Sequence, residues 1–323
     1  MSIFSLSGKT AVVTGGGSGI GRELARQLAA AGCNVAMCDL SAEAMAETRR
    51  LCSAGAPQGT RITTHIADVS DETQVIGFRD GVRREHDTDH IHLLFNNAGI
   101  GGGGSFLNAE RSEWEKTFNV CWFGVYCCTR AFLPMILKAN EAHIVNTSSV
   151  NGFWASLGPT RPHTAYSAAK FAVKGFTEAL INDLRLNAPH VKCSVVMPGH
   201  IGTAIMRNSR KILSGKSLEE MTGADFAQAR KGIAAAGKDA SAMSDEQVRA
   251  VLAEAVRHFE DNAPTTAAEA ATVILNGVRD GQWRILIGPD ARILDELVRQ
   301  APEGAYEPGF TERLRKEGHW RGF

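Results

Sequence analysis

The stretch Thr14-Gly15-Gly16-Gly17-Ser18-Gly19-Ile20-Gly21 follows a short β-branched run and opens directly into a helical pattern. Glycines here let the backbone turn sharply and approach a pyrophosphate, whose charge then rests on the N–H groups of the helix N-terminus. A tight strand-to-helix connection without a ligand is the alternative. Because the loop lies in the first βαβ unit, dinucleotide binding is favoured. The expected cofactor contacts in this loop are Gly15, Ser18, Gly19, Ile20 and Gly21.

Short apolar runs alternate with longer helical patterns outward from this loop, which is typical of repeated βαβ units. The expected strands are residues 10–14, 34–39, 61–65, 91–96, 143–147, 193–197 and 283–287. The expected helices are residues 19–31, 42–53, 71–85, 111–138, 164–186, 267–279 and 292–299. The sequence therefore predicts an α/β fold, a single doubly wound Rossmann-type domain with a seven-stranded parallel sheet.

This single domain is expected to span residues 1–323, with 1–150 as mainly the cofactor half and 151–290 as the catalytic and substrate half. The βαβ pattern weakens between about 200 and 264, where Gly/Ala/Lys-rich pieces predict a mostly helical lid insertion over the carboxyl edge of the sheet. A surface loop is the alternative for this segment. Residues 290–323 are expected to form a C-terminal extension.

Charge and cysteine usage argue against several classes of function. Lys+Arg and Asp+Glu both total 35, so electrostatics gives no reason to expect nucleic acid or an anionic membrane as partner. The seven cysteines lack zinc-ligand spacing and disulfide-scaffold density, which indicates no metal site and a cytoplasmic location. No secretory signal is visible, and Arg130 and Pro134 interrupt the one span-like stretch, 120–137. A small molecule is the expected partner.

Asp39 ends the second expected strand, 18 residues beyond Gly21. A carboxylate here can accept hydrogen bonds from the adenosine ribose hydroxyls, with Leu40 beside it, and would repel a 2′-phosphate. Ser18 adds no positive charge, so NAD is favoured over NADP. Arg22, in the first turn of the helix, is the one cation that could reach a phosphate.

Tyr166 and Lys170 are four residues apart in an expected helix, so both side chains lie on one face. A free tyrosine titrates near ~10. A fixed cation favours the phenolate and moves the pKa of the phenol toward the range that acid/base chemistry needs. An ordinary amphipathic helix with a solvated lysine is the alternative.

Taken together, these motifs make the chain resemble the classical short-chain dehydrogenase/reductase family over residues 8 to about 203. The resemblance rests on their order: the glycine stretch 14–21, Asp68-Val69, Asn96-Asn97-Ala98-Gly99, Asn119, Ser148-Ser149, Tyr166-x-x-x-Lys170 and Pro198-Gly199-x-x-x-Thr203. One departure is a longer interval between Ser149 and Tyr166, which an enlarged substrate loop at 155–163 explains.

The resemblance implies a role for each matching position. Asp68 and Val69 would border the adenine, although Asp68 could only cap a turn. Two further groups of cofactor contacts are implied, Asn97, Ala98 and Gly99 after the fourth strand, and Pro198, Gly199, Ile201 and Thr203 after the sixth. Asn119 would bend its helix and hold a water that links Lys170 to solvent.

The resemblance also implies a catalytic set of Asn119, Ser149, Tyr166 and Lys170. Ser149 would donate a hydrogen bond to the substrate oxygen, and it fits the family pattern better than the adjacent Ser148. Lys170 would bond the nicotinamide ribose and lower the pKa of Tyr166. The expected reaction interconverts a secondary alcohol and a ketone.

Apolar bulk near the predicted site favours a hydrophobic or ring-containing substrate. The expected substrate contacts are Asn151, Phe153, Trp154, His163, His200 and Met206. The competing function is a catalytically silent NAD-binding regulator or scaffold. An epimerase or dehydratase of the extended branch is disfavoured by the glycine spacing. The resemblance suggests a homodimer or homotetramer, formed through the helices 111–138 and 164–186.

Overall fold

The computed structural model describes residues 5–159, 161–235, 237 and 239–318. Small parts of the predicted regions lie outside the described residues. They are residues 1–4 of the expected domain, 160 of the substrate loop, 236 and 238 of the expected lid, and 319–323 of the C-terminal extension.

A seven-stranded parallel sheet forms the centre of the fold, in the order β3-β2-β1-β4-β5-β6-β9. Its strands are β1 (Thr10–Thr14), β2 (Asn34–Asp39), β3 (Ile62–Ile66), β4 (Leu93–Asn96), β5 (Ala142–Thr147), β6 (Val191–Pro198) and β9 (Arg284–Ile287). All six strand pairs are parallel. The predicted fold class is confirmed, and each expected strand is present with small shifts at its ends. The order reverses between β1 and β4, where doubly wound sheets open a crevice for ligands.

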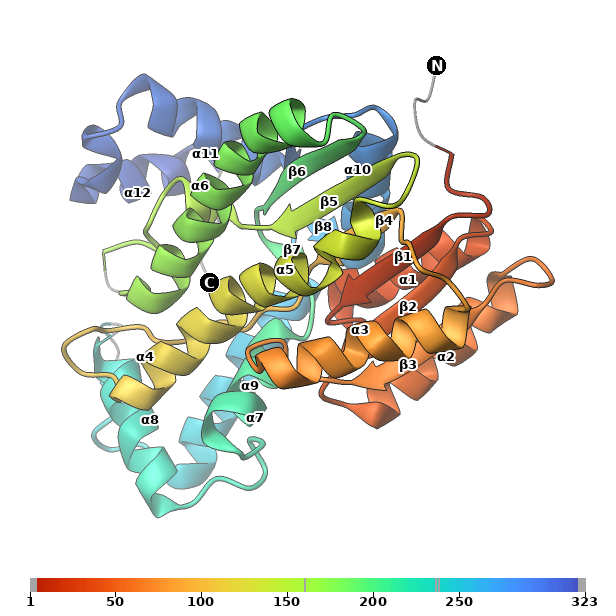
Figure 1. Cartoon of the computed structure of the whole chain (residues 1–323). Helices are drawn as coiled ribbons and strands as arrows, with labels where there is room; N and C mark the ends of the chain where they lie inside the picture. The colour runs from red at the N-terminus through yellow and green to blue at the C-terminus, as the bar shows by residue number, and fades with distance from the viewer. Residues whose placement is uncertain (1–4, 160, 236, 238, 319–323) are drawn as a thin grey trace.

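Helices cover both faces of the sheet (Figure 1). Helices α1 (Gly19–Ala30), α2 (Ala42–Gly55) and α10 (Ala267–Arg279) contribute to one buried core. Helices α3 (Glu72–His86), α5 (Gly124–Ile136) and α6 (Thr164–Asn187) contribute to the other. The inner strands β1, β2, β4, β5 and β6 are largely buried on both faces, which explains their apolar runs, whereas the edge strands β3 and β9 are partly exposed.

The helix expected at 111–138 is interrupted by a π-helical turn. Helix α4 (Arg111–Phe118) leads into the turn Asn119–Phe123, which continues into α5. The Gly124 N–H donates to the Asn119 carbonyl, one residue further back than in an α-helix. Such turns insert one extra residue and often lie at functional sites. The π-helical turn begins at Asn119, where the resemblance implied a bend, and the bend itself stays a prediction.

Two additions flank the carboxyl edge of the sheet (Figure 1). The first contains β7 (Ile201–Gly202), α7 (Ile205–Ser214), α8 (Gly223–Ala235), α9 (Asp245–Asp261) and β8 (Thr265–Thr266). Its helical character agrees with the prediction, and Phe226 and Val248 belong to its own small core. The second contains α11 (Pro289–Gln300), a 3-10 turn at Gly304–Tyr306 and α12 (Pro308–Lys316).

Candidate active site

The glycine loop folds into a shape that only glycine permits. Gly15 and Gly19 have φ angles of +68° and +53°. A Cβ on Gly15 would lie 2.9 Å from the Ala98 Cα. A Cβ on Gly21 would lie 2.7 Å from the side-chain nitrogen of Asn97 and would collide with the Gly15 carbonyl. The loop therefore presents bare backbone at the N-terminus of α1, an arrangement that could hold a pyrophosphate. Its Ile20 packs partly buried against the core.

The Asp39 carboxylate holds this loop at the end of β2. Its Oδ2 accepts a hydrogen bond from the Gly17 N–H at 2.9 Å, and its Oδ1 accepts from the Ser41 N–H at 3.2 Å. Arg22 is engaged from the other side, because its Nη2 donates to the Gly17 carbonyl at 2.6 Å and its Nε to Thr48 Oγ1 at 3.0 Å. The guanidinium thus serves the loop fold. Leu40, next to Asp39, is exposed.

The segment after β4 is fixed to the end of β1. Thr14 Oγ1 accepts hydrogen bonds from the N–H groups of Asn97 and Ala98, both at 3.0 Å. The Asn97 amide donates to the Thr14 carbonyl at 3.1 Å. A Cβ on Gly99 would lie 3.5 Å from Lys170 Nζ, so Gly99 leaves room beside the lysine. This segment therefore joins the glycine loop to the Tyr166/Lys170 helix.

Asp68 and Val69 follow β3, next to β2. The Asp68 Oδ1 accepts hydrogen bonds from the Ser70 N–H and hydroxyl at 2.9 and 2.7 Å. Val69 is buried, and its side chain fills the space beside Gly124. Asp68 thus has the turn-capping role that was the alternative, and an adenine contact for either residue stays a prediction.

Tyr166, Ser149 and Lys170 meet at the carboxyl edge of the sheet. Ser149 follows β5 and lies beside the phenol of Tyr166, where burial raises the pKa of the phenol and the Ser149 hydroxyl acts in the opposite direction. Lys170 Nζ lies 5.4 Å from the centre of the Tyr166 ring and donates to the Thr147 carbonyl at 2.8 Å. Ser148 points elsewhere, because its hydroxyl donates to the Lys170 carbonyl at 2.7 Å. The structure thus brings Ser149, and not Ser148, to the phenol.

The environment of these groups differs from the expectation in one respect. Burial raises the pKa of Tyr166 above its ordinary value, and the neighbouring Cys121 thiol acts in the same direction. Burial also lowers the pKa of Lys170. Desolvation is thus the largest influence on both groups. A lowering of the Tyr166 pKa by Lys170 stays a prediction for the reacting complex.

Asn119 opens the π-helical turn that packs against α6, the helix of Tyr166 and Lys170. Two residues further on, the Cys121 thiol is buried and donates to the Ile100 carbonyl at 3.2 Å. Sequence reasoning missed Cys121, because no motif marks a cysteine inside an apolar helix.

The segment 198–203 leaves β6 and runs back to the glycine loop. Pro198 pairs with Ile287 of β9, and Ile201 is buried and pairs with Thr265. A Cβ on Gly19 would lie 3.2 Å from Thr203 Cγ2, so Thr203 packs against the glycine loop.

Helix α7 is hydrogen-bonded both to the glycine loop and to the loop that follows β4. The Asn208 amide donates to Ser18 Oγ at 3.1 Å, and the Ser209 hydroxyl accepts from the Gly101 N–H at 2.8 Å. At the end of α7, Lys116 Nζ donates to the Ile212 carbonyl at 2.7 Å. Neither Asn208 nor Ser209 belongs to a recognisable motif, so the sequence held no signal for them.

One expected substrate residue contacts the catalytic tyrosine. The His163 ring lies 4.7 Å from the Tyr166 ring, centre to centre, with an angle of 31° between the planes. Burial lowers the pKa of His163 to about 4. Its imidazole is therefore neutral near pH 7 and can donate or accept one hydrogen bond beside the phenol. Met206 is half-buried on α7.

The other four expected substrate residues are held by protein groups, and the Asn151 N–H donates to Ser149 Oγ at 3.2 Å. Trp154 is fully buried under the C-terminal helices, and its indole donates to the Ala305 carbonyl at 2.8 Å. Phe153 packs against the same cluster. Asn151 donates to two loop carbonyls, and His200 Nε2 bonds the Phe259 carbonyl at 2.8 Å. Prediction of a substrate contact is wrong for Trp154, because the C-terminal extension buries its indole.

Within the described residues, no group of three or more His, Cys, Asp or Glu side chains is placed to hold a metal ion. Over the same part of the chain, every helix is too short or too polar to cross a bilayer. All seven cysteines are buried as free thiols.

The chain is similar to known proteins in both sequence and structure. The family model described as short chain dehydrogenase matches residues 9–213. SadH of Mycobacterium tuberculosis, an oxidoreductase by name, is 34% identical over 295 residues, 91% of each chain. A short-chain dehydrogenase/reductase from Burkholderia phymatum, crystallised with NAD, has a TM-score of 0.74 at 28% identity, over 94% of this chain and 98% of that one. A metagenomic short-chain oxidoreductase with NADP has a TM-score of 0.53 at 32% identity, over 60% of this chain and 84% of that one.

Proposed function

Because the chain belongs to the short-chain dehydrogenase family of oxidoreductases, we propose that it interconverts a secondary alcohol and a ketone with NAD(H). The observation that carries the proposal is the cluster of Tyr166, Ser149 and Lys170, in which Lys170 Nζ lies 5.4 Å from the centre of the tyrosine ring. The glycine loop at the same sheet edge supplies a cradle for a dinucleotide. When bound, the dinucleotide would supply the hydride acceptor or donor.

Each catalytic side chain has a distinct task in this proposal. In the oxidation direction Tyr166 takes the proton of the substrate hydroxyl, and in reduction it returns that proton to the ketone oxygen. Ser149 donates a hydrogen bond to the same oxygen as charge develops there. Lys170 holds the cofactor ribose and favours the phenolate when the ligands are in place. Asn119 would keep the water that links Lys170 to solvent.

The choice of NAD over NADP rests on charge at the end of β2. The Asp39 carboxylate is bonded to the Gly17 N–H and would repel a 2′-phosphate near the end of β2. Arg22, the nearby cation, is bonded to the Gly17 carbonyl and Thr48. The Burkholderia phymatum relative was crystallised with NAD, and the metagenomic one with NADP. The charge around Asp39 favours the first cofactor.

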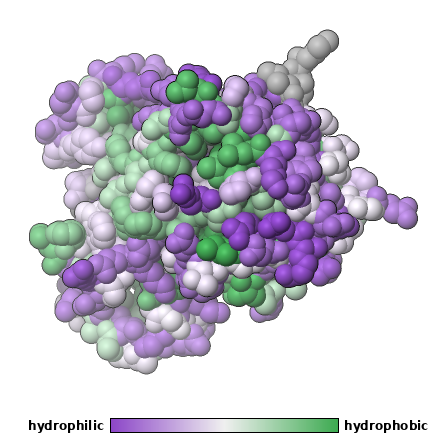
Figure 2. Space-filling model, viewed as in Figure 1, coloured by the Kyte–Doolittle hydropathy of each residue, from purple (hydrophilic) through white to green (hydrophobic). Residues whose placement is uncertain are grey.

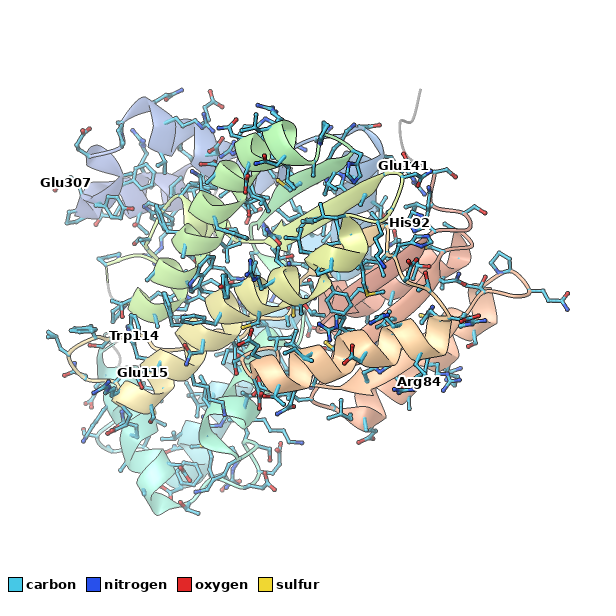
Figure 3. All side chains as sticks on the ribbon, in the orientation of Figure 1. Arg84, His92, Trp114, Glu115, Glu141 and Glu307 are labelled. Carbon is cyan, nitrogen blue, oxygen red and sulfur yellow. The ribbon has the colours of Figure 1, made fainter. Side chains whose placement is uncertain are left out.

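A hydrophobic substrate is favoured by the approach to the site. The loop before α4 is bonded to the start of α6, because the Gly103 and Gly104 carbonyls accept from the N–H groups of Ala165 and Thr164. Its next apolar residues, Phe106 and Leu107, are 73% and 89% exposed. Trp114 of α4, labelled in Figure 3, donates to Thr164 Oγ1 at 3.1 Å. These apolar side chains lie on a loop and a helix that are bonded to the start of α6, the helix of Tyr166, and they support a hydrophobic substrate.

The test is a screen of the purified protein with NAD and NADP against secondary alcohols of increasing size and hydrophobicity. The proposal expects NADH formation from at least one alcohol, with ring-containing alcohols preferred over small sugars. Tight NAD binding without turnover of any alcohol or ketone would instead favour the silent regulator. Failure to bind either dinucleotide would contradict both functions.

The proposal includes a homodimer or homotetramer built on α5 and α6. Apolar side chains gather over these two helices on the face shown in Figure 2. Tyr126 of α5 and Phe171 of α6 are 42% and 40% exposed there, and Phe123 lies in the same area. A second copy of the chain related by a two-fold axis would cover the same patch on both subunits.

A further inference from the structure

Asp290 is a buried carboxylate that none of the sequence motifs includes. It lies in the first turn of α11, beyond the residues 9–213 that match the family model, and is only 9% exposed. Its Oδ2 accepts a hydrogen bond from the His200 N–H at 2.6 Å. A buried carboxylate is costly unless its hydrogen bonds offset the loss of water, so its place against segment 198–203 requires an explanation.

Segment 198–203 is shaped around this carboxylate. A Cβ on Gly199 would lie 2.5 Å from Asp290 Cγ, closer than real Cβ contacts allow. Gly288, at the start of α11, has a φ angle of +95° and would also bring a Cβ against the Asp290 carboxylate. Both glycines therefore leave room for one side chain, and the Gly199 N–H is bonded to the Ile287 carbonyl at 2.9 Å.

We propose that Asp290 is a positioning residue that sets the segment 198–203 for the nicotinamide end of the cofactor. This inference rests on the proposed function. The carboxylate bonds the backbone at His200, one residue before Ile201 and three before Thr203, the residues expected to hold the carboxamide. In this proposal the C-terminal extension acts on the cofactor indirectly, through the backbone of segment 198–203.

Burial raises the pKa of Asp290, while the His200 N–H acts in the opposite direction. An ionised carboxylate makes this hydrogen bond charge-assisted, and such bonds are roughly twice as strong as neutral ones. Replacing the carboxylate by an amide keeps its volume and weakens the bond. Replacing it by alanine leaves the buried His200 N–H without its acceptor, which is the more costly change.

The experiment compares two ligands that differ only at the nicotinamide end, NAD and ADP-ribose. Dissociation constants for both are measured by calorimetry on the native protein, Asp290→Asn and Asp290→Ala. The NAD constant should rise about 5-fold in Asp290→Asn and 10-fold or more in Asp290→Ala, in line with the cost of an unpaired buried N–H. The ADP-ribose constant should stay within about 2-fold, because ADP-ribose lacks the carboxamide that Ile201 and Thr203 are proposed to hold.

Asp295→Asn is the matched control. Asp295 is a buried acid of the same helix, but its carboxylate pairs with Arg284 and Arg299, away from segment 198–203. It should destabilise the fold without changing the ratio of the NAD and ADP-ribose constants. Equal weakening of NAD and ADP-ribose binding in the Asp290 variants would overturn the inference. A selective loss of NAD binding in Asp295→Asn would overturn it as well.

A double-mutant cycle tests the steric part. Gly199→Ala should weaken NAD binding strongly in the native background and much less in Asp290→Ala, because the colliding carboxylate is gone. Independent effects of the two substitutions would contradict the proposed contact. If Asp290→Ala does not fold, Asp290→Asn still tests the inference, since the amide keeps the volume of the carboxylate. A native protein that binds neither ligand would defeat the proposed function as well, whereas native binding with unchanged ratios defeats this inference alone.

Discussion

The Asp39 carboxylate accepts a hydrogen bond from the Gly17 N–H at 2.9 Å, so one side chain both shapes the glycine loop and places a negative charge at the end of β2. A Cβ on Gly17 would lie 2.8 Å from the same carboxylate oxygen. The fold of the loop and the proposed preference for NAD therefore involve the same residue. Changing it should affect both.

Asp39→Ala should shift cofactor preference toward NADP. Loss of the ribose and loop contacts should lower kcat/KM with NAD about 10-fold or more, and removal of the repulsion should raise kcat/KM with NADP. Steady-state kinetics with both cofactors measure the ratio. Asp71→Ala is the control, because Asp71 caps α3 and makes no contact with the loop. An unchanged NADP/NAD ratio in Asp39→Ala would remove the argument for NAD.

Tyr166→Phe should abolish turnover and leave NADH binding nearly intact. The substitution removes only the hydroxyl that exchanges a proton with the substrate, and general acid/base groups contribute about 10²–10⁴-fold to rate. Turnover is measured with the best alcohol of the screen, and binding by NADH fluorescence. An active Tyr166→Phe enzyme would defeat the assignment of the phenol.

Ser149→Ala and Ser148→Ala should separate the two adjacent serines. Ser149 lies beside the Tyr166 phenol, so its loss should lower kcat about 10²-fold or more. Ser148 donates to the Lys170 carbonyl, so its loss should mainly lower the melting temperature. The measurement is kcat together with thermal unfolding for both variants. A larger loss of kcat in Ser148→Ala would reverse the assignment.

Local pattern predicted most of the fold, because the inner strands are buried on both faces and form short apolar runs. It did not predict the π-helical turn at Asn119, since insertion of one residue leaves the apolar pattern of a long helix nearly unchanged. It also gave no account of how the two additions pack at the carboxyl edge of the sheet. Those contacts join residues far apart in sequence.

In the candidate site, too, short-range relationships could be predicted from the sequence and long-range contacts could not. Tyr166 and Lys170 could be paired from their spacing alone, because four residues make one helical turn. Trp154 was misassigned, because its burial depends on the Ala305 carbonyl, 151 positions away. Asp290 was missed for a related reason, since its partner at His200 is 90 positions away. Short-range spacing holds no information on such contacts.

Phe171→Glu should convert the assembly to a smaller species. If a second subunit covers the aromatic patch on α5 and α6, the substitution places a charge in a buried apolar contact on both sides of a two-fold axis. Light scattering should show the mass falling toward that of one 34.7 kDa chain. Leu186→Glu, at an exposed position near the end of α6, is the control. A native protein that is already monomeric would rule out this assembly.

Acid should destabilise the protein through histidines that are neutral in the folded state, and His143 is the clearest case. Its Nε2 lies 2.6 Å from Ser194 Oγ, whose hydroxyl donates to the Gln282 carbonyl. Burial lowers the pKa of His143 to about 3. An unfolded histidine titrates near ~6.5, so the unfolded chain takes up the proton first as the pH falls.

The stability contributed by neutral His143 is therefore present above about pH 6.5 and is lost as the pH falls toward 3. One proton taken up only by the unfolded chain changes the free energy of unfolding by about 1.4 kcal/mol per pH unit. His143→Asn should reduce the slope of unfolding free energy between pH 6 and 4 by about 1 kcal/mol per pH unit, measured by urea unfolding. His258→Asn, at an exposed position on α9, should change the slope far less. Equal slopes in native protein and His143→Asn would show that His143 is not held neutral by the fold.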